Sequence, residues 1–169
     1  MKIRVKNISP TSKMAAFVAL SLTALGATAS AVMAQADVKL PYWVSVTEDE
    51  ARMRTGPSTD FPVKWVYKRK DLPFKVVARH SVWRKVEDPD GDQGWMHVRL
   101  LSPQRTAVVI GSGVGALRDA PSPTAHIAWR VESGVVGRID DCKNGWCRLD
   151  IAGRAGYIEG DRLYGEEAL

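Results

Sequence analysis

Two motifs in this sequence have residue types and spacings that could hold a cofactor or a metal. Residues 107–116 read AVVIGSGVGA, a strand-like run followed by the G-x-G-x-x-A pattern of dinucleotide sites. That pattern must open a helix whose N-terminus receives a pyrophosphate. Pro121 and Pro123 follow too soon for a helix to continue. We therefore expect a glycine-rich linker with a strand at its start, and no cofactor.

The second motif is the acidic stretch DPDGDQG at residues 88–94, which places aspartates at alternate positions as a calcium loop does. The sixth position of such a loop should be Gly and is Gln93, and the twelfth should be Glu and is Arg99. A solvated acidic hairpin turn fits these residues better, and no metal site is expected.

The remaining polar residues form no recognisable catalytic set. His80, His97 and His126 are far apart in the sequence, and none has a Ser or Cys partner at a defensible spacing. The chain contains no nucleophile elbow and no zinc-protease motif. We therefore expect a protein that is not an enzyme.

The two cysteines, Cys142 and Cys147, flank a Lys-Asn-Gly-Trp segment. Asn-Gly is typical of a two-residue type I′ hairpin turn. In that hairpin the cysteines face each other in a non-hydrogen-bonded pair, where side chains lie close enough for a structural disulfide. A redox pair and two metal ligands are the alternatives. The first usually has C-x-x-C on a helix, and the second needs more ligands nearby.

The first 36 residues have the order of a secretory signal peptide. A cationic start with no acidic residue precedes an apolar run at 14–33, and Ala34-Gln35-Ala36 follows as a small-x-small cleavage pattern. An uncleaved membrane anchor is the alternative, because about 20 apolar residues can span a bilayer. We expect cleavage after Ala36, a secreted or periplasmic protein, and no membrane contact afterwards.

Cleavage also changes the charge of the chain. The full sequence has 24 basic and 19 acidic residues, and the leader contains four of the basic ones and no acid. The mature chain is therefore almost neutral, and nucleic acid is not expected as a partner.

Most of the mature chain is a repeat, which decides how it is organised. Arg54 and Trp65 recur as Arg118 and Trp129, 64 residues later, and Trp83 recurs as Trp146, 63 residues later. Each copy consists of short runs of β-branched and aromatic residues between Gly, Pro and Asp turns. This pattern predicts an all-β fold of two tandem small β-barrels.

The segments RMRTGPS (52–58), VWRKVEDPDGDQGWM (82–96) and a closing LL resemble the bacterial SH3-like domain. GWC at 145–147 and LYG at 163–165 are similar to a subgroup found in exported proteobacterial proteins. The second copy has Ala120 where the first has Gly56. The resemblance implies five or six strands per barrel and non-catalytic binding of peptides or cell-wall fragments. The expected domains are a signal peptide at 1–36, SH3-like repeat 1 at 37–103, a linker with a junction strand at 104–115, and SH3-like repeat 2 at 116–169.

Strand parity gives the candidate binding residues. Val86 and Met96 should face the core, with Val98 on the same side, which leaves Trp83 and Trp95 pointing outward. Outward aromatic side chains could stack against a sugar or a peptide, or they could pack against the other barrel. Arg54 and Phe61 belong to a loop that resembles the ligand loop of the family. The candidate ligand-binding residues are Arg54, Phe61, Trp83, Trp95, Trp146 and Tyr157.

The sequence as a whole predicts an exported, non-catalytic binding module of two SH3-like domains. The expected ligand is a peptide or a cell-wall (peptidoglycan) fragment. The alternative is a structural adaptor or inhibitor that binds another envelope protein.

Overall fold

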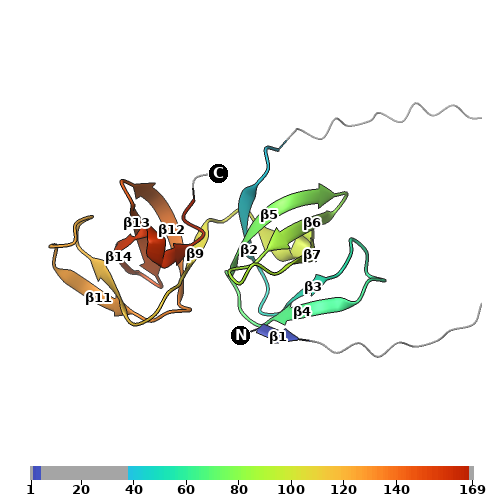
Figure 1. Cartoon of the computed structure of the whole chain (residues 1–169), viewed down its shortest axis with the longest axis horizontal. Coiled ribbons are helices and arrows are strands. Elements are labelled where there is room, and N and C mark those ends of the chain that lie inside the picture. Colours follow the sequence, from blue (N-terminus) through green and yellow to red (C-terminus); the bar gives the residue numbers. More distant parts are fainter. Residues whose placement is uncertain (1, 5–37, 168–169) are drawn as a thin grey trace, which may run out of the picture.

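The computed structural model describes residues 2–4 and 38–167 (Figure 1). The described chain contains β-strands, two short 3₁₀-helices and no α-helix. It has no helix that is long and apolar enough to cross a membrane. The predicted signal peptide lies outside the described residues except for β1 (Lys2–Arg4), which pairs with β4.

The first repeat forms one antiparallel sheet with the strand order β1-β4-β3-β7-β6-β5-β2-β8. Its elements after β1 are β2 (Tyr42–Val46), β3 (Ala51–Arg54), β4 (Val63–Tyr67), β5 (Pro73–His80), β6 (Trp83–Glu87), β7 (Gln93–His97), the 3₁₀-helix η1 (Val98–Leu100) and β8 (Leu101–Ser102).

The second repeat forms a second sheet with the order β11-β10-β14-β13-β12-β9-β15. Its elements are β9 (Thr106–Val109), β10 (Gly115–Arg118), β11 (Ile127–Val131), β12 (Val136–Lys143), β13 (Trp146–Ile151), β14 (Arg154–Glu159), the 3₁₀-helix η2 (Gly160–Arg162) and β15 (Leu163–Tyr164). Apart from β1, the two strand orders correspond one to one, which confirms the predicted all-β tandem.

Each sheet is open, whereas the sequence suggested closed barrels. The hydrogen-bonded order of the strands does not return to its starting strand in either repeat. At one end of each order, β8 and β15 have only two residues each. The segment at 104–115, expected to link the repeats, contains β9, which pairs with both β12 and β15 in the second sheet.

Each repeat has its own hydrophobic core. Val86 and Met96 are fully buried in the first, and their counterparts Leu149 and Ile158 are buried in the second. These residues alternate with outward-facing ones along neighbouring strands, as period-two patterning predicts. Two separate clusters of this kind account for two small folding units in one short chain.

Two equivalent strands, β2 and β9, differ from the others because both of their faces are buried. Val44 and Val46 of β2 belong to the first core, while Trp43 on the opposite face is only 6% exposed. All four residues of β9 are buried as well. Figure 1 shows β9 between the two repeats, and β9 contacts β5 of the first sheet. The second face of each strand is therefore covered at the junction between the repeats.

The junction is held by β15 and the C-terminal segment that follows it. Tyr164 packs edge-to-face on Trp43 with ring centroids 4.9 Å apart, and its hydroxyl donates to the main-chain oxygen of Glu87 at 2.8 Å. Glu167 accepts a hydrogen bond from the Trp43 indole at 3.0 Å through its main-chain oxygen, and its carboxylate pairs with Lys75 at 2.9 Å. An edge-to-face aromatic contact, an ion pair and hydrogen bonds to main-chain oxygens thus fix one repeat on the other.

The acidic turn between β6 and β7 is not the fully solvated tip that the sequence suggested, because Asp88 is 1% exposed. One of its carboxylate oxygens accepts the backbone N–H groups of Asp90 and Asp92, and the other accepts the Tyr67 hydroxyl at 2.7 Å. The first aspartate of the motif therefore organises the turn and anchors it to the core.

Burial, together with the hydrogen bond to Asp88, raises the pKa of Tyr67 far above its ordinary value, and burial raises the pKa of Tyr164. The unfolded chain releases these protons near pH 10, whereas the folded chain retains them. The free energy of unfolding should therefore fall as the pH rises above about 10. Urea unfolding between pH 9 and 11.5 should show a shallower fall for Tyr67→Phe than for the wild-type chain. Equal slopes for both proteins would contradict this assignment.

Candidate functional site

The outer face of repeat 1 carries the predicted aromatic residues on β6 and β7. Trp83 lies opposite His97 and Lys85 lies opposite Trp95, on the face away from Val86. The rings of Trp83 and His97 meet edge-to-face at 5.3 Å, which leaves Trp83 only 9% exposed. The side chains therefore form a packed outer surface in which Trp83 is covered by its neighbours.

Val98, expected to face the core, is instead exposed. Strand β7 ends at His97, and η1 begins with Val98, so the alternation of the strand does not extend to it. The His97 ring accepts the backbone N–H of Arg99 through Nδ1 at 3.1 Å and caps this turn. The same side chain therefore ends the strand and contacts Trp83.

A groove of about 300 Å³ lies beside the Trp83–His97 pair. Its lining residues are Glu50, Arg52, Arg54, Thr59, Trp83, His97, Arg99 and Leu100. Three arginines face one acidic residue there, and Glu50 pairs with Arg52 at 3.1 Å. The Arg99 side chain has no hydrogen-bond or ion-pair partner within the described chain. The groove is therefore cationic with an aromatic wall, which suits an anionic group.

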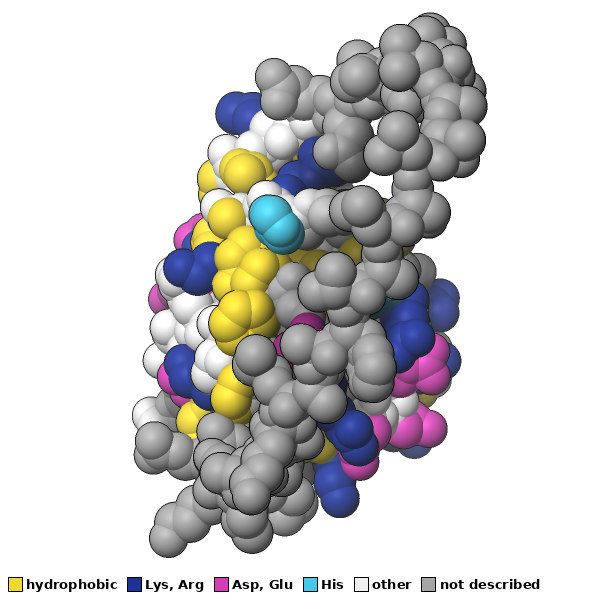
Figure 2. Space-filling view, turned by 90° about the vertical axis from the view of Figure 1, so that its right-hand side faces the viewer, with side chains coloured by type: hydrophobic (Ala, Val, Ile, Leu, Met, Phe, Trp, Pro, Cys, Tyr) yellow, Lys and Arg dark blue, Asp and Glu magenta, His cyan; other side chains and the backbone are white. Residues whose placement is uncertain are grey.

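Of the predicted residues in repeat 1, the structure brings Arg54 and Trp83 together in this groove. Trp95 lies next to Arg54 in the sheet register but outside the groove, with its ring 6.4 Å from the ring of His80. Phe61 is 44% exposed at the loop and does not line the groove either. Figure 2 shows apolar side chains in a stripe, with basic side chains beside it, on the face formed by the ends of the β3–β4 and β5–β6 hairpins.

Arg52 and Arg99 are the two groove arginines that sequence reasoning missed. Arg52 and Arg54 occupy alternate positions of β3, and Arg52 is exposed while Met53 between them is buried. Their spacing contained a signal for a shared cationic face. Arg99 had no such signal, because its position depends on the turn of η1.

Arg54 has a structural role that recurs in the second repeat. Its guanidinium donates to the main-chain oxygen of Phe61, seven residues later, at 2.7 Å. Arg118 donates in the same way to Ala125, also seven residues later and at 2.7 Å. Both arginines hold the loop that follows their strand. In Arg54, this hydrogen bond is made by one terminal nitrogen of the guanidinium group.

The loops differ in how tightly they pack. The Phe61 ring lies over Gly56, where an added Cβ would come within 2.5 Å of the ring. In repeat 2 the matching residues are Ala120 and Ala125, so the glycine and the ring are lost together. Repeat 2 does not need a glycine at position 120, because the residue at 125 is alanine and has no ring. Its loop is still held by Arg118.

The outer face of repeat 2 has the same register with different residues. Trp146 lies opposite Glu159, and Arg148 lies opposite Tyr157. A groove of about 340 Å³ is lined by Pro121, Lys143, Asn144, Trp146, Arg148 and Tyr157. Arg148 pairs with Asp140 at 2.7 Å, so its charge is partly neutralised. The predicted Trp146 and Tyr157 are thus brought together in a groove that is more aromatic than cationic.

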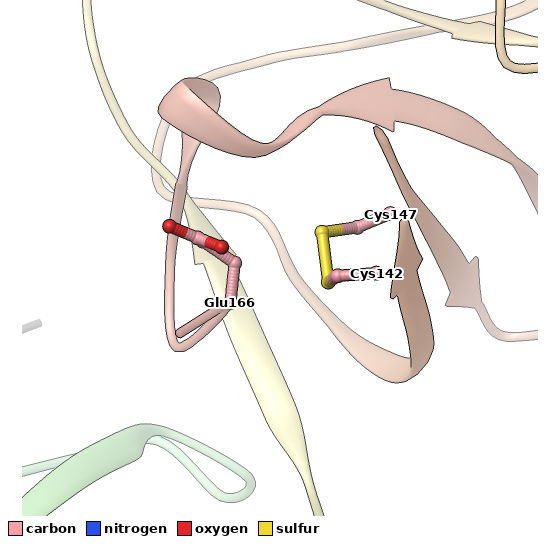
Figure 3. A group of neighbouring side chains, drawn as sticks. All are labelled: Cys142, Cys147 and Glu166. Atoms are coloured by element: carbon pink, nitrogen blue, oxygen red, sulfur yellow. A yellow bond between two sulfur atoms is a disulfide. The ribbon is translucent and has the colours of Figure 1, made fainter. Parts of the chain in front are cut away.

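The predicted disulfide is confirmed. Cys142 and Cys147 are bonded and directly opposite each other, with Cα atoms 4.1 Å apart. Asn144 and Gly145 both have positive φ, as a type I′ turn requires. Figure 3 shows the Glu166 carboxylate next to this disulfide, and the ligand atoms of the three residues lie within 4.8 Å of one another. Both sulfurs are bonded to each other here, so the cluster has the chemistry of a structural crosslink.

A comparison with family models matches the bacterial SH3 domain at residues 47–103 and again at residues 112–165. The chain belongs to the bacterial SH3 domain family. The first match covers β3–β8 of the first sheet and the second covers β10–β15 of the second sheet, so the protein is a tandem bacterial SH3 protein. Domains of this family generally bind cell-wall or peptide partners.

No curated protein matches this bacterial SH3 tandem. Among solved structures, it is similar to NlpC1 from Trichomonas vaginalis, with 18% identity and a TM-score of 0.34 over 77% of this chain. It is also similar to NlpC2 from the same organism, with 17% identity and a TM-score of 0.34 over 73% of this chain. The chain spans about half the length of these structures, 48% of each.

The packing of Phe61 on Gly56 gives a test of the loop. Gly56→Ala should destabilise repeat 1 by about 1 kcal/mol, at the low end for overpacking because the exposed ring can shift. In a Phe61→Ala background the same substitution should cost much less, since repeat 2 already has alanine at both positions. A double-mutant cycle from denaturant unfolding measures this coupling. An equal cost in both backgrounds would mean that the ring does not rest on the glycine.

Proposed function

We propose that this bacterial SH3 tandem is an exported, non-catalytic binding module that recognises a peptidoglycan fragment through its outer faces. The groove of repeat 1 carries the proposal. It places the side chains of Arg52, Arg54 and Arg99 beside the Trp83–His97 pair. A stem peptide of the cell wall presents carboxylates and an extended backbone, which match guanidinium groups next to an aromatic wall.

The two grooves support different contacts with such a ligand. Repeat 1 offers Arg99, whose guanidinium has no partner within the described chain, for a carboxylate. Repeat 2 offers the rings of Trp146 and Tyr157 for stacking against a sugar or an uncharged part of a peptide. Because the junction fixes the repeats on each other, one fragment that reaches both grooves gains from their effective concentration.

A second function is favoured by the junction itself. Trp43, Tyr164 and Glu167 join the repeats through several contacts, and this suits an adaptor or inhibitor that presents loops to one envelope protein. In that case the loops at Phe61 and Ala125 would form the contact surface, and purified cell wall would not compete for it.

Sedimentation with purified cell-wall sacculi tests the preferred function. The full tandem should be retained at low salt and released as salt increases, because the contact in repeat 1 is between charges. Arg99→Gln should reduce the retained fraction several-fold. Arg130→Gln, an exposed arginine outside both grooves, should leave it unchanged and serves as the matched control.

Two results would contradict peptidoglycan recognition by this groove. One is equal loss of retention in Arg99→Gln and Arg130→Gln, which would indicate general charge attraction. The other is no retention of the wild-type chain at any salt concentration, in which case the adaptor function becomes the better account.

A further inference from the structure

The sheet registers show which positions of the two repeats are equivalent at the junction strands. In repeat 1, Trp43 of β2 lies opposite Lys75 of β5. In repeat 2, Thr106 of β9 lies opposite Arg138 of β12. Thr106 therefore corresponds to Trp43, and Arg138 corresponds to Lys75.

In repeat 1 this position binds an acidic peptide segment, namely the C-terminal segment of the chain itself. The indole of Trp43 donates to the main-chain oxygen of Glu167, and Lys75 pairs with the Glu167 carboxylate. The Lys75 ammonium also lies 5.3 Å from the centre of the Trp43 ring. One side-chain donor for a carbonyl and one cation for a carboxylate thus make up this peptide-binding position.

In repeat 2 the equivalent position is a pocket of about 460 Å³. It is lined by Asp71 of repeat 1 and by Thr106, Val136, Gly137, Arg138 and Asp150–Gly153 of repeat 2. A threonine stands where repeat 1 has a tryptophan, so the indole volume becomes available space. The pocket involves both repeats, which are also joined by a hydrogen bond from Arg69 to the main-chain oxygen of Gly134 at 2.6 Å.

Two polar side chains of this pocket, those of Thr106 and Arg138, have no hydrogen-bond or ion-pair partner among the described residues. Thr106 is 2% exposed, and its buried hydroxyl makes no hydrogen bond in the described structure. A buried hydroxyl without a partner is unfavourable, and an acceptor supplied by a ligand would relieve that cost. Arg138 makes no ion pair or side-chain hydrogen bond with the described residues, although Asp71 and Asp150 line the same pocket.

We propose that the junction pocket binds an extended acidic peptide segment of another protein. A carboxylate of the segment pairs with Arg138, as Glu167 pairs with Lys75 in repeat 1. A carbonyl of the segment accepts from the Thr106 hydroxyl, as the carbonyl of Glu167 accepts from Trp43. The site is separate from the two outer grooves, so it does not depend on peptidoglycan recognition.

The acidic residues near Arg138 are compatible with an acidic ligand. Asp150 lies opposite Arg138 in the register, and Glu87 lies opposite Lys75 in the same way. Glu87 does not prevent the pairing of Lys75 with Glu167. Asp150 already accepts the backbone N–H of Gly153 at 2.7 Å, and Asp71 can accept an N–H of the peptide backbone.

The probe is a fluorescein-labelled Leu-Tyr-Gly-Glu-Glu peptide, which copies residues 163–167 and therefore the segment bound in repeat 1. Fluorescence anisotropy with the full tandem chain should show saturable binding. Arg138→Gln should weaken it at least tenfold, and a Leu-Tyr-Gly-Gln-Gln peptide should bind as weakly to the wild-type chain. Arg130→Gln, on β11 outside the pocket, should bind like the wild type.

Lys75→Gln distinguishes the two equivalent positions. If the peptide displaces the C-terminal segment of the chain from repeat 1, Lys75→Gln should weaken binding while Arg138→Gln leaves it intact, and the proposal is then wrong. No binding to the wild-type chain, or equal affinity for the Glu and Gln peptides, would also overturn it. Backbone amide shifts at Gly137 and Gly153 in nuclear magnetic resonance spectra should follow the same titration.

Discussion

The contact between Trp43 and Tyr164 is the interaction on which the arrangement of this protein depends. It joins β2 of the first sheet to β15 of the second, and Glu167 extends it to Lys75. Each repeat has a small core and would be only marginally stable alone. Covering the second face of β2 and β9 buries apolar area that neither repeat could bury by itself. The junction therefore adds stability and creates a pocket that a single repeat would lack.

The equivalence of the repeats gives meaning to the residues that differ between them. Gly56 and Phe61 in one loop become Ala120 and Ala125 in the other, which preserves the loop while changing its surface. His97 opposite Trp83 becomes Glu159 opposite Trp146, which changes the charge of the outer face.

Conserved geometry is just as informative. Arg54 and Arg118 make the same main-chain contact at the same spacing. The two repeats thus share a scaffold and differ in the groups that they present. At the junction, the position of Trp43 and Lys75 in repeat 1 is equivalent to that of Thr106 and Arg138 in repeat 2. The first binds the C-terminal segment of the chain, and the second lines a pocket.

Much of the fold of each repeat could be predicted from the sequence, because strands, turns and core positions depend on local patterns. The repeat offsets predicted two all-β units, and Asn144-Gly145 predicted both the hairpin and the disulfide. Strand parity placed Val86 and Met96 in the core. The prediction for Val98 was wrong because a 3₁₀ turn begins there, and the buried role of Asp88 depends on Tyr67, 21 residues earlier.

The junction could not be predicted in the same way. Its contacts join residues far apart in the sequence, such as Trp43 and Glu167, which are separated by 124 positions, and no periodicity reports such a pairing. In the sequence, the junction is indicated only by the segment TAVV at 106–109, which lacks the alternation of a strand with one exposed face. The structure shows that all four of these residues are buried. The groove arginines depend likewise on how β3 and η1 meet.

Residual dipolar couplings of backbone amides in the full tandem chain test the central claim most directly. If Trp43, Tyr164 and Glu167 fix the repeats, one alignment tensor should fit the couplings of residues 42–102 and 106–164 together. Tyr164→Ala should then require a separate tensor for each repeat. Separate tensors already in the wild-type chain would show that the repeats move independently and would contradict this account.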